Sequence, residues 1–359
     1  MTPCTYALLN GDGPTPLFRQ PFDDAEHHGR TMRKVLHVGP CDTPGGMATV
    51  MHTLAEFPPE GWQAELLASH APGGLWAKWR AYRRARRELK RRCSDPALRP
   101  DIVHVHTAAD WSWRRKARLI RIAQNHAIPT IVHVHSGQFD SWLAKGGPQR
   151  VTSIRRTLEQ QNTFGVVLSK HWAEKLQPML GELEYVPNPV VRPNFKDVIV
   201  RKKGQMLLLG RNDPVKGHDF AIEVAQMLHK KLGNVSLIMT GKELKSVQPV
   251  QQLGWISETE KQQFLRESSV LLVPSLFEGQ PIVVLEALAY GLPVLASDQL
   301  HSLPASVHFV PRDVPDWVDF LEEFFTSSKH EKSVVLPTEH RIENVSERWL
   351  ELYGRMLNP

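Results

Sequence analysis

Two glutamates eight positions apart, Glu278 and Glu286, are the residues of this sequence that most strongly suggest chemistry. Glu278 lies in a turn that contains Gly279 and Pro281, whereas Glu286 lies inside the apolar run "VVLEALA". Burying an unpaired carboxylate is costly, so Glu286 must turn to solvent or meet a polar partner that the chain itself need not supply. Pro281 suits the first position of a helix, and Glu286 would then lie near the helix N-terminus. A carboxylate there can accept hydrogen bonds from two adjacent hydroxyls, as on a ribose.

Two cations follow a predicted strand in "MLLLGRNDPVKGHDF", where Arg211 leaves the strand and Lys216 approaches a helix. An Arg fork and a compact Lys charge together suit a diphosphate. Taken singly, each could equally be a surface charge. The first half of the chain offers a second phosphate-type site, because Gly45 and Gly46 precede a helical stretch whose backbone N–H groups are free. Ordinary turn chemistry also explains this glycine pair.

Four histidines lie near the ends of two predicted strands, "DIVHVH" and "TIVHVH". The outer members, His106 and His135, would be nearest the edge of the sheet, and the inner members, His104 and His133, suit hydrogen-bonded core positions. The two His-x-His pairs also allow a metal site. No matched carboxylate or cysteine set stands nearby in the sequence, so we expect no metal.

These residues must be positioned by parallel sheets, because short β-branched runs alternate with helix-length segments from Lys34 onward. Three prolines within residues 187–193 separate two such series. The fold class predicted is α/β, with two Rossmann-like, doubly wound domains facing each other across a cleft. Ligands of such sheets bind beyond the carboxyl ends of the strands, where the residues above are found. The predicted divisions are a loosely ordered extension at 1–32, domains at 33–190 and 191–338, and a C-terminal helix at 339–359 that packs back on the first domain.

Composition agrees with a globular protein, since 41% of the 359 residues are hydrophobic. The cysteines, Cys4, Cys41 and Cys93, are odd in number and lack metal-ligand spacing, which favours the cytoplasm. The N-terminal residues are too polar for a signal peptide. No apolar run approaches the roughly 20 residues that a spanning helix needs.

The positive charge of the chain is concentrated in residues 76–92, which contain nine Lys or Arg residues and one acid, Glu88. That segment carries a net charge of +8, whereas the whole chain carries +6. On a helix, Leu75, Trp79, Tyr82 and Leu89 would form a stripe that packs on the sheet, with most cations opposite. A solvated surface helix is one interpretation. Anionic lipid head groups that relieve the repulsion between cations are the other, and we predict a membrane contact here.

Several motifs in this order resemble the retaining nucleotide-sugar glycosyltransferases of the GT-B fold, family four in the sequence classification. They are the turn "PGGMATV", the segment "GRNDPVKG", the approach "GWISETEKQQFLRESSVLLVPS" and the glutamate pair of "FEGQPIVVLE". The resemblance runs from about Lys34 to about Asp298. It implies that the second domain holds the donor and the first domain the acceptor. Two departures are Gln280, where Phe is common, which could alter sugar choice, and "QLHSLPASVHFV", which lacks the usual Gly-Gly turn.

The resemblance also implies roles for individual residues. Arg211 and Lys216 would bind the donor diphosphate, Glu286 the ribose, and Glu278 the transferred sugar. The remaining assignments place Gly279, Gln280 and Pro281 at the sugar, Gly46 with Gly45 at the diphosphate, and His135 near the anomeric carbon.

The predicted function is therefore transfer of a hexose-type sugar from a nucleoside diphosphate sugar, with retention and without a metal or other cofactor. The expected acceptor is a lipid-linked glycan or glycolipid in envelope polysaccharide assembly, at the inner face of the plasma membrane. A nucleotide-sugar epimerase of the same fold and a metal-dependent hydrolase remain alternatives. A nucleic-acid-binding protein would explain the sequence pI of about 9.2 but not Glu286.

Overall fold

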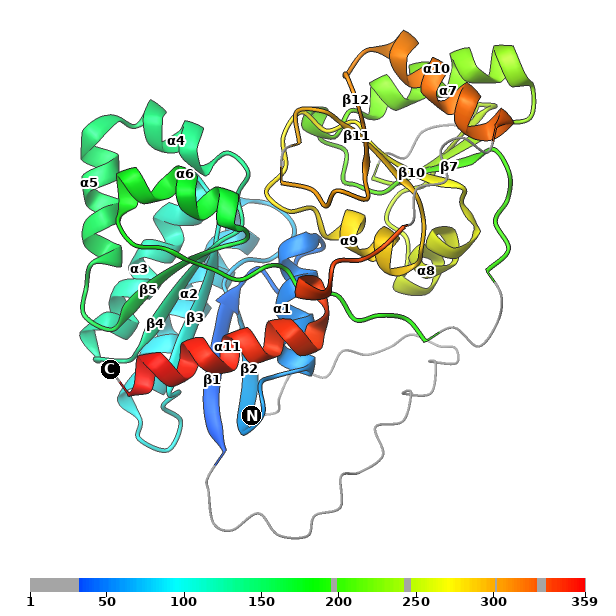
Figure 1. Ribbon diagram of the computed structural model, residues 1–359. Coiled ribbons are helices and arrows are strands. Elements are labelled where there is room, and N and C mark those ends of the chain that lie inside the picture. The colour runs from blue at the N-terminus through cyan, green and yellow to red at the C-terminus, as the bar shows by residue number, and fades with distance from the viewer. Residues whose placement is uncertain (1–31, 195–198, 242–246, 301, 328–333, 359) are drawn as a thin grey trace, which may run out of the picture. The chain divides into compact units, whose positions relative to one another are not determined.

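The structure is a computed structural model that describes residues 32–194, 199–241, 247–300, 302–327 and 334–358. The predicted N-terminal extension, residues 1–32, lies outside this part of the chain except for Met32. Residues Arg33–Pro359 form one compact unit, which contains two lobes, each built on a parallel sheet. Figure 1 shows the two sheets with their helices.

The first sheet has the strand order β2-β1-β3-β4-β5-β6, and all its pairings are parallel. Its strands are nearly continuous runs of buried residues, as expected for a sheet covered by helices on both faces. The strands are β1 (Arg33–Gly39), β2 (Trp62–Ala68), β3 (Ile102–Thr107), β4 (Thr130–Val134), β5 (Thr163–Val167) and β6 (Glu184–Tyr185). The helices of this lobe are α1 (Gly46–Glu56), α2 (Leu75–Ser94), α3 (Trp111–Asn125), α4 (Phe139–Lys145), α5 (Gly147–Leu158) and α6 (Lys170–Leu180).

The second sheet has the order β12-β11-β10-β7-β8-β9, again with parallel pairings. Its strands are β7 (Gln205–Leu208), β8 (Ser236–Met239), β9 (Val250–Gln252), β10 (Val270–Val273), β11 (Val294–Ser297) and β12 (His308–Val310). Its helices are α7 (His218–Leu232), α8 (Glu258–Glu267), α9 (Ile282–Ala289) and α10 (Val314–Thr326), with a short 3-10 turn at Pro214–Lys216. The predicted fold class, two doubly wound α/β domains, is confirmed. The strands β6, β9 and β12 were not predicted, because two or three residues carry too little pattern.

The last helix, α11 (Ile342–Leu357), follows a 3-10 turn at Thr338–His340 and packs on the first sheet. The ring of Tyr353 lies 4.6 Å from that of Trp62, between centroids, and its hydroxyl contacts His104 at 3.3 Å. Figure 1 shows α11 lying across the strands of the first lobe. The segment that leads to it runs beside the linker from the first lobe, because Val190 N donates to His340 O at 2.8 Å.

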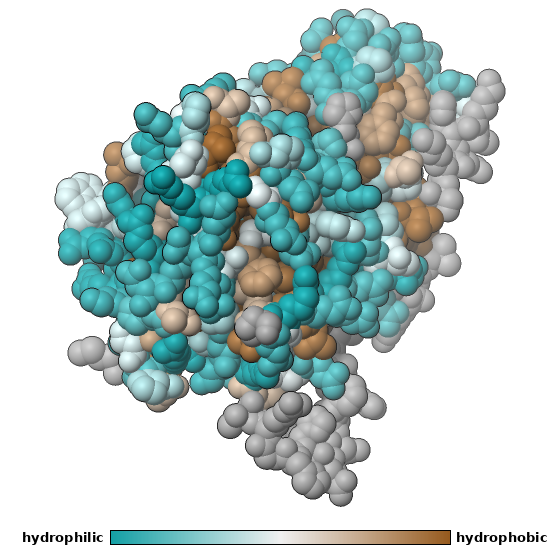
Figure 2. All heavy atoms as spheres, turned by 60° about the vertical axis from the view of Figure 1, so that its left-hand side comes forward, coloured by the Kyte–Doolittle hydropathy of each residue, from teal (hydrophilic) through white to brown (hydrophobic). Residues whose placement is uncertain are grey.

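The helix α2 forms as predicted, and Tyr82 and Leu89 of its predicted apolar stripe pack against the core, but the other two stripe residues do not. The residues of α2 that face the sheet are Ala81, Ala85, Leu89 and Cys93. Leu75 and Trp79 are instead 85% and 46% exposed, and the first buried residue of the helix is Ala81. Its solvent face carries the cations, as predicted. Figure 2, which brings forward the side of Figure 1 with α4 and α5, shows hydrophilic side chains over most of that surface.

Candidate active site between the two lobes

Lys216 and Glu278 form an ion pair in the second lobe, with Lys216 Nζ 2.5 Å from Glu278 Oε1. Ser275 donates to the same carboxylate oxygen at 2.8 Å. Two backbone features bring the residues together. Gly217 has φ 73° and lies against the carbonyl of Pro274, where a Cβ would be 2.5 Å from the oxygen. Leu276 N donates to Val215 O at 2.9 Å, so the loop after β7 is fixed to the loop after β10.

Arg211, the other predicted diphosphate ligand, does not join this pair in the structure. Its guanidinium contacts Asp213 at 2.9 Å, and its side chain is 70% exposed. Asp213 also accepts from Val215 N at 3.1 Å and caps the short 3-10 turn that ends at Lys216. Arg211 is therefore held beside the loop with most of its surface open to a ligand.

Glu286 has a polar partner within the chain, Lys261, which the sequence did not reveal. Its Oε1 lies 2.7 Å from Lys261 Nζ on α8, and Lys261 also contacts Glu258 at 2.9 Å. The other oxygen, Oε2, is buried and has no hydrogen-bond partner among the described residues. Burial raises the pKa of Glu286, and the charge of Lys261 opposes that shift. One oxygen of the Glu286 carboxylate is thus paired with Lys261, and the other is buried without a hydrogen-bond partner among the described residues.

The turn that contains Glu278 and Gly279 packs directly against the loop after β4 in the first lobe. A Cβ at Gly137 would lie 2.2 Å from the carbonyl carbon of Glu278, and one at Gly279 would lie 2.8 Å from His135 O. Trp172 of α6 donates from Nε1 to Gly279 O at 3.2 Å. Only glycines permit this approach, which places His135 next to the Glu278 turn.

Gln280 is buried and joins the second lobe to the linker and to the first lobe. Its Oε1 accepts from Asn188 N at 2.6 Å, and its Nε2 donates to Leu168 O at 3.2 Å. Its backbone oxygen accepts from Asn188 Nδ2 at 2.9 Å. The neighbouring Pro281 caps α9 at its N-terminus. The side chain of Gln280 is fully used in these contacts, a role that the sequence did not reveal.

Gly45 and Gly46 mark the start of α1, as predicted. Gly45 is the N-cap residue, with φ 144°, and both glycines are exposed. A Cβ at Gly46 would lie 3.3 Å from Ile282 Cγ2, so the helix N-terminus of the first lobe adjoins the start of α9. The free N–H groups at such a terminus can bind an anion.

His135 is the end of a chain of buried histidines on one face of the first sheet. Its Nε2 lies 3.0 Å from His106 Nδ1, and His106 Nε2 lies 3.0 Å from His37 Nδ1. A second pair joins His104 Nε2 to His133 Nδ1 at 3.1 Å. Burial lowers the pKa of His37 and His135 to about 3 and that of the others well below the ordinary value. The rings are therefore neutral at physiological pH.

The sequence pointed to four of these histidines but not to His37. The parallel registers pair His37 with His104 and His106 with His133, which brings all the rings to one face. Nitrogens within two groups of three lie within 4.8 Å of one another. In the first of these groups, the rings of His104 and His106 are stacked at 4.3 Å and 10°. Each of the five rings shares a nitrogen with a neighbouring ring, so hydrogen bonds between the histidines account for their arrangement.

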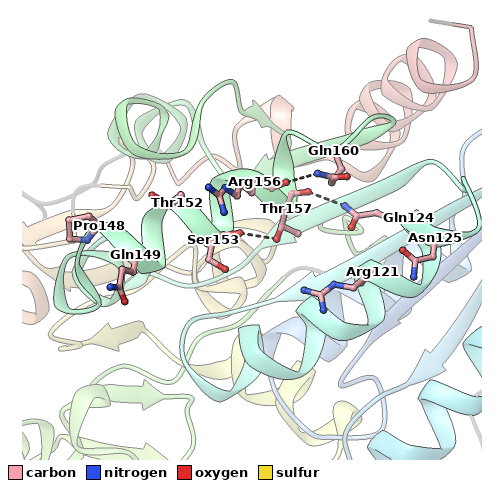
Figure 3. A pocket seen from close by; sticks show the side chains of 10 residues that line it. All are labelled: Arg121, Gln124, Asn125, Pro148, Gln149, Thr152, Ser153, Arg156, Thr157 and Gln160. Carbon is pink, nitrogen blue, oxygen red and sulfur yellow. Dashed lines mark hydrogen bonds between the residues drawn. The ribbon is translucent and has the colours of Figure 1, made fainter.

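A polar hollow of about 740 Å³ lies elsewhere in the first lobe, between α3 and α5. Figure 3 shows Gln124 directed toward Thr157, with Arg121 and Arg156 beside them. The hollow contains none of the predicted site residues.

Comparison with known proteins covers both lobes. Residues 44–191 match the family model described as Glycosyltransferase Family 4, and residues 203–324 match the model described as Glycosyl transferases group 1. Sucrose-phosphate synthase from Thermosynechococcus elongatus has a similar solved structure, with a TM-score of 0.63 at 13% identity, covering 91% of this chain and 99% of its own. The chain has the GT-B glycosyltransferase fold.

Curated relatives of this GT-B chain are similar over shorter stretches. An uncharacterized glycosyltransferase of Haemophilus influenzae is 31% identical over 136 residues, or 35% of this chain and 38% of the relative. The amylovoran biosynthesis glycosyltransferase AmsD of Erwinia amylovora is 28% identical over 112 residues, or 29% of this chain and 32% of the relative. The matches thus span about a third of the length of each relative.

Proposed function

We propose that this protein transfers a hexose-type sugar from a nucleoside diphosphate sugar to an acceptor hydroxyl, with retention of anomeric configuration. The observation that carries the proposal is the contact of the Glu278 turn with the His135 loop. It brings a Lys216–Glu278 pair from one lobe beside a neutral histidine from the other. Matches to glycosyltransferase families in both lobes support it.

In the proposed reaction, Lys216 and Arg211 bind the donor diphosphate, and Glu286 accepts from the ribose through its unpaired Oε2. The bond between the anomeric carbon and the phosphate oxygen breaks, and the electron pair leaves with the nucleoside diphosphate. The cations stabilise the negative charge that grows on that leaving group, which is usually a large catalytic contribution. The acceptor oxygen attacks from the same face, and its proton passes to the departing phosphate. No metal or other cofactor is required in this scheme.

His135 and Glu278 would position the transferred sugar. A histidine whose pKa is lowered to about 3 stays neutral, so His135 can accept or donate a hydrogen bond without repelling positive charge at the anomeric carbon. Its Nδ1 has no hydrogen-bond partner in the described part of the chain. Glu278 keeps a second oxygen, Oε2, beside the one that Lys216 and Ser275 occupy.

Release of nucleoside diphosphate that depends on an added acceptor tests the proposal and separates it from its rivals. A transferase releases the diphosphate with acceptor and forms a new glycoside, whereas an epimerase changes the sugar without releasing it. A metal-dependent hydrolase would lose activity with a chelator. Acceptor-independent turnover, with no glycoside formed, would overturn the proposal.

We further propose that the acceptor is lipid-linked and that α2 contacts an anionic membrane. Leu75, Trp76 and Trp79 are exposed at the start of α2, and Trp111 at the start of α3 is 66% exposed. Arg83 stacks over Trp79 at 4.7 Å. The exposed cations of α2 other than Arg91 have no carboxylate partner among the described residues. Exposed tryptophans beside unpaired cations are typical of peripheral membrane contacts.

No helix in the described part of the chain combines the length and apolarity needed to span a bilayer. Co-sedimentation with vesicles therefore tests a surface contact. The protein should bind vesicles with anionic lipid, dissociate at high salt, and bind poorly when Arg83, Arg84, Arg87 and Arg91 become Ser. The double variant Arg84/Arg87→Ser should already weaken binding to these vesicles. Its matched control, Lys203/Lys230→Ser on the second lobe, should leave binding unchanged. Equal binding to neutral vesicles would contradict the charge-based contact.

A further inference from the structure

Lys116 of α3 is a buried lysine that the proposed reaction does not use. Lys116 is 1% exposed, and its Nζ donates a hydrogen bond to Ser69 Oγ at 2.5 Å. No carboxylate forms an ion pair with it among the residues that the structure describes. Burial and the neighbouring charge of Arg115 lower the pKa of Lys116 to about 7. A buried cation without a counter-charge destabilises a fold, so such a group is commonly retained for a ligand.

The surroundings of Lys116 lie where β1 and β2 end, at the carboxyl edge of the first sheet. Ser69 and His70 directly follow β2, and Ser69 Oγ donates to Gly39 O, the last residue of β1, at 3.0 Å. Thr43 Oγ1 lies 3.1 Å from His70 Nδ1. In parallel α/β sheets this edge is the one at which ligands bind.

Two more cations, Arg115 and Lys78, act on His70 together with Lys116. Burial, and after it the positive charges of Arg115, Lys78 and Lys116, lower the pKa of His70 to about 4. Arg115 has a buried Nε without a hydrogen-bond partner in the described structure. The nearby carboxylate, Asp42, contacts the thiol of Cys41 at 3.7 Å and forms no ion pair with any of the three cations. The charges of these three cations therefore act on His70, and none of the three forms an ion pair with a carboxylate in the part of the chain that the structure describes.

We propose that Lys78, Arg115 and Lys116 bind a phosphate group of the acceptor at the carboxyl edge of β1 and β2. A guanidinium fork with two ammonium groups suits phosphate oxygens. The assignment to the acceptor rests on the proposed function, which gives the donor diphosphate to Arg211 and Lys216 in the second lobe. The acceptor would then be a phosphate ester or diphosphate.

Inorganic pyrophosphate is the probe, and thermal shift with calorimetric titration is the readout. Lys116→Met should leave the free protein as stable as the wild type or more stable, because it removes a buried charge. It should weaken pyrophosphate binding at least about tenfold, the factor expected for one lost charge-assisted hydrogen bond. Arg118→Gln, an exposed change on the same helix, should leave binding unchanged.

Other variants separate this site from the donor site. Lys216→Ala should lose nucleoside diphosphate binding and keep the Lys116-dependent binding of pyrophosphate. If Lys116→Met does not fold, Lys78→Gln with Arg115→Gln gives the same test at half-buried positions. Vesicles containing phosphatidic acid, compared with soluble pyrophosphate, show whether the phosphate can be that of a lipid.

The proposal is overturned if Lys116→Met and the double variant bind pyrophosphate as tightly as the wild type. It is also overturned if Lys216→Ala alone abolishes the binding. These outcomes do not depend on sugar transfer. A protein without transferase activity that still binds pyrophosphate through Lys116 would refute the proposed function and leave the anion site standing.

Discussion

Glu286 offers a test at the scale of a single carboxylate, because one oxygen holds Lys261 and the other is buried without a partner. Glu286→Gln is nearly isosteric and should weaken donor binding by about tenfold or more, since a charge-assisted hydrogen bond to the ribose is lost. Calorimetric titration of the nucleotide sugar measures this. Glu258→Gln is the control, because Glu258 contacts the same lysine and is 63% exposed. Equal weakening in both variants would assign the effect to Lys261.

Lys216 and Arg211 test the stabilisation of the leaving group. Replacing either with Ala should lower kcat at saturating donor by about 10²–10³-fold, because each would stabilise charge that develops as the donor bond breaks. Lys216→Ala also leaves Glu278 with Ser275 as its hydrogen-bond partner. Near wild-type kcat in the Arg211 variant would mean that its contact with Asp213 is only a surface ion pair.

Sequence reasoning located many of these side chains but not the partners that hold them. Glu278 and Lys216 lie in the loops that follow β10 and β7, and parallel strands bring such loops to one edge of the sheet, so their common location could be predicted but not their ion pair. Lys261 lies on a helix 25 residues before Glu286, with no periodic signal that links them. His37 belongs to an ordinary apolar strand, and only the register with β3 shows that it joins the other histidines.

Among the elements, the loop after β4 packs closely against the turn that contains Glu278. Gly137→Ala would place a Cβ within about 2.2 Å of the Glu278 backbone, so the two loops must separate. We expect kcat to fall by at least about tenfold, while the melting temperature changes little, because misplaced catalytic groups cost more in rate than in stability. Gly74→Ala is the matched control, since nothing lies within 4 Å of the added Cβ. Full activity in Gly137→Ala would show that the contact is dispensable.

The helix α2 shows that helical periodicity alone does not predict which residues of a helix are buried. Amphipathic spacing predicted that Leu75 and Trp79 pack inward, but periodicity gives only the direction of a side chain around the helix. It does not show how far the underlying sheet extends along the helix axis. Ala81, Ala85 and Leu89 are buried, whereas no residue before Ala81 in this helix is.

For the whole described unit, the buried histidines predict how stability depends on pH. His37 and His135 have pKa values of about 3 in the folded protein, below the ordinary 6.5. Unfolding therefore takes up protons between about pH 3 and about pH 6.5, and the free energy of unfolding falls as the pH falls through that range. The slope is about 1.4 kcal/mol per pH unit for each proton.

Urea unfolding at about pH 5 and about pH 7 measures this slope. His37→Phe should reduce it by about one proton, because one buried neutral imidazole is removed. A slope that is the same in the variant and the wild type would show that His37 does not contribute.

The packing of α11 on the first sheet has a consequence for synthesis of the chain on the ribosome. Trp349 and Tyr353 contact His104, which Tyr353 follows in the sequence by 249 residues. Domains usually fold in the order in which they emerge, N-terminal first. Here all of the second lobe is translated before the helix that covers the histidine face of the first. That face therefore stays uncovered while the second lobe is made, and the first lobe becomes complete only after the second has left the ribosome.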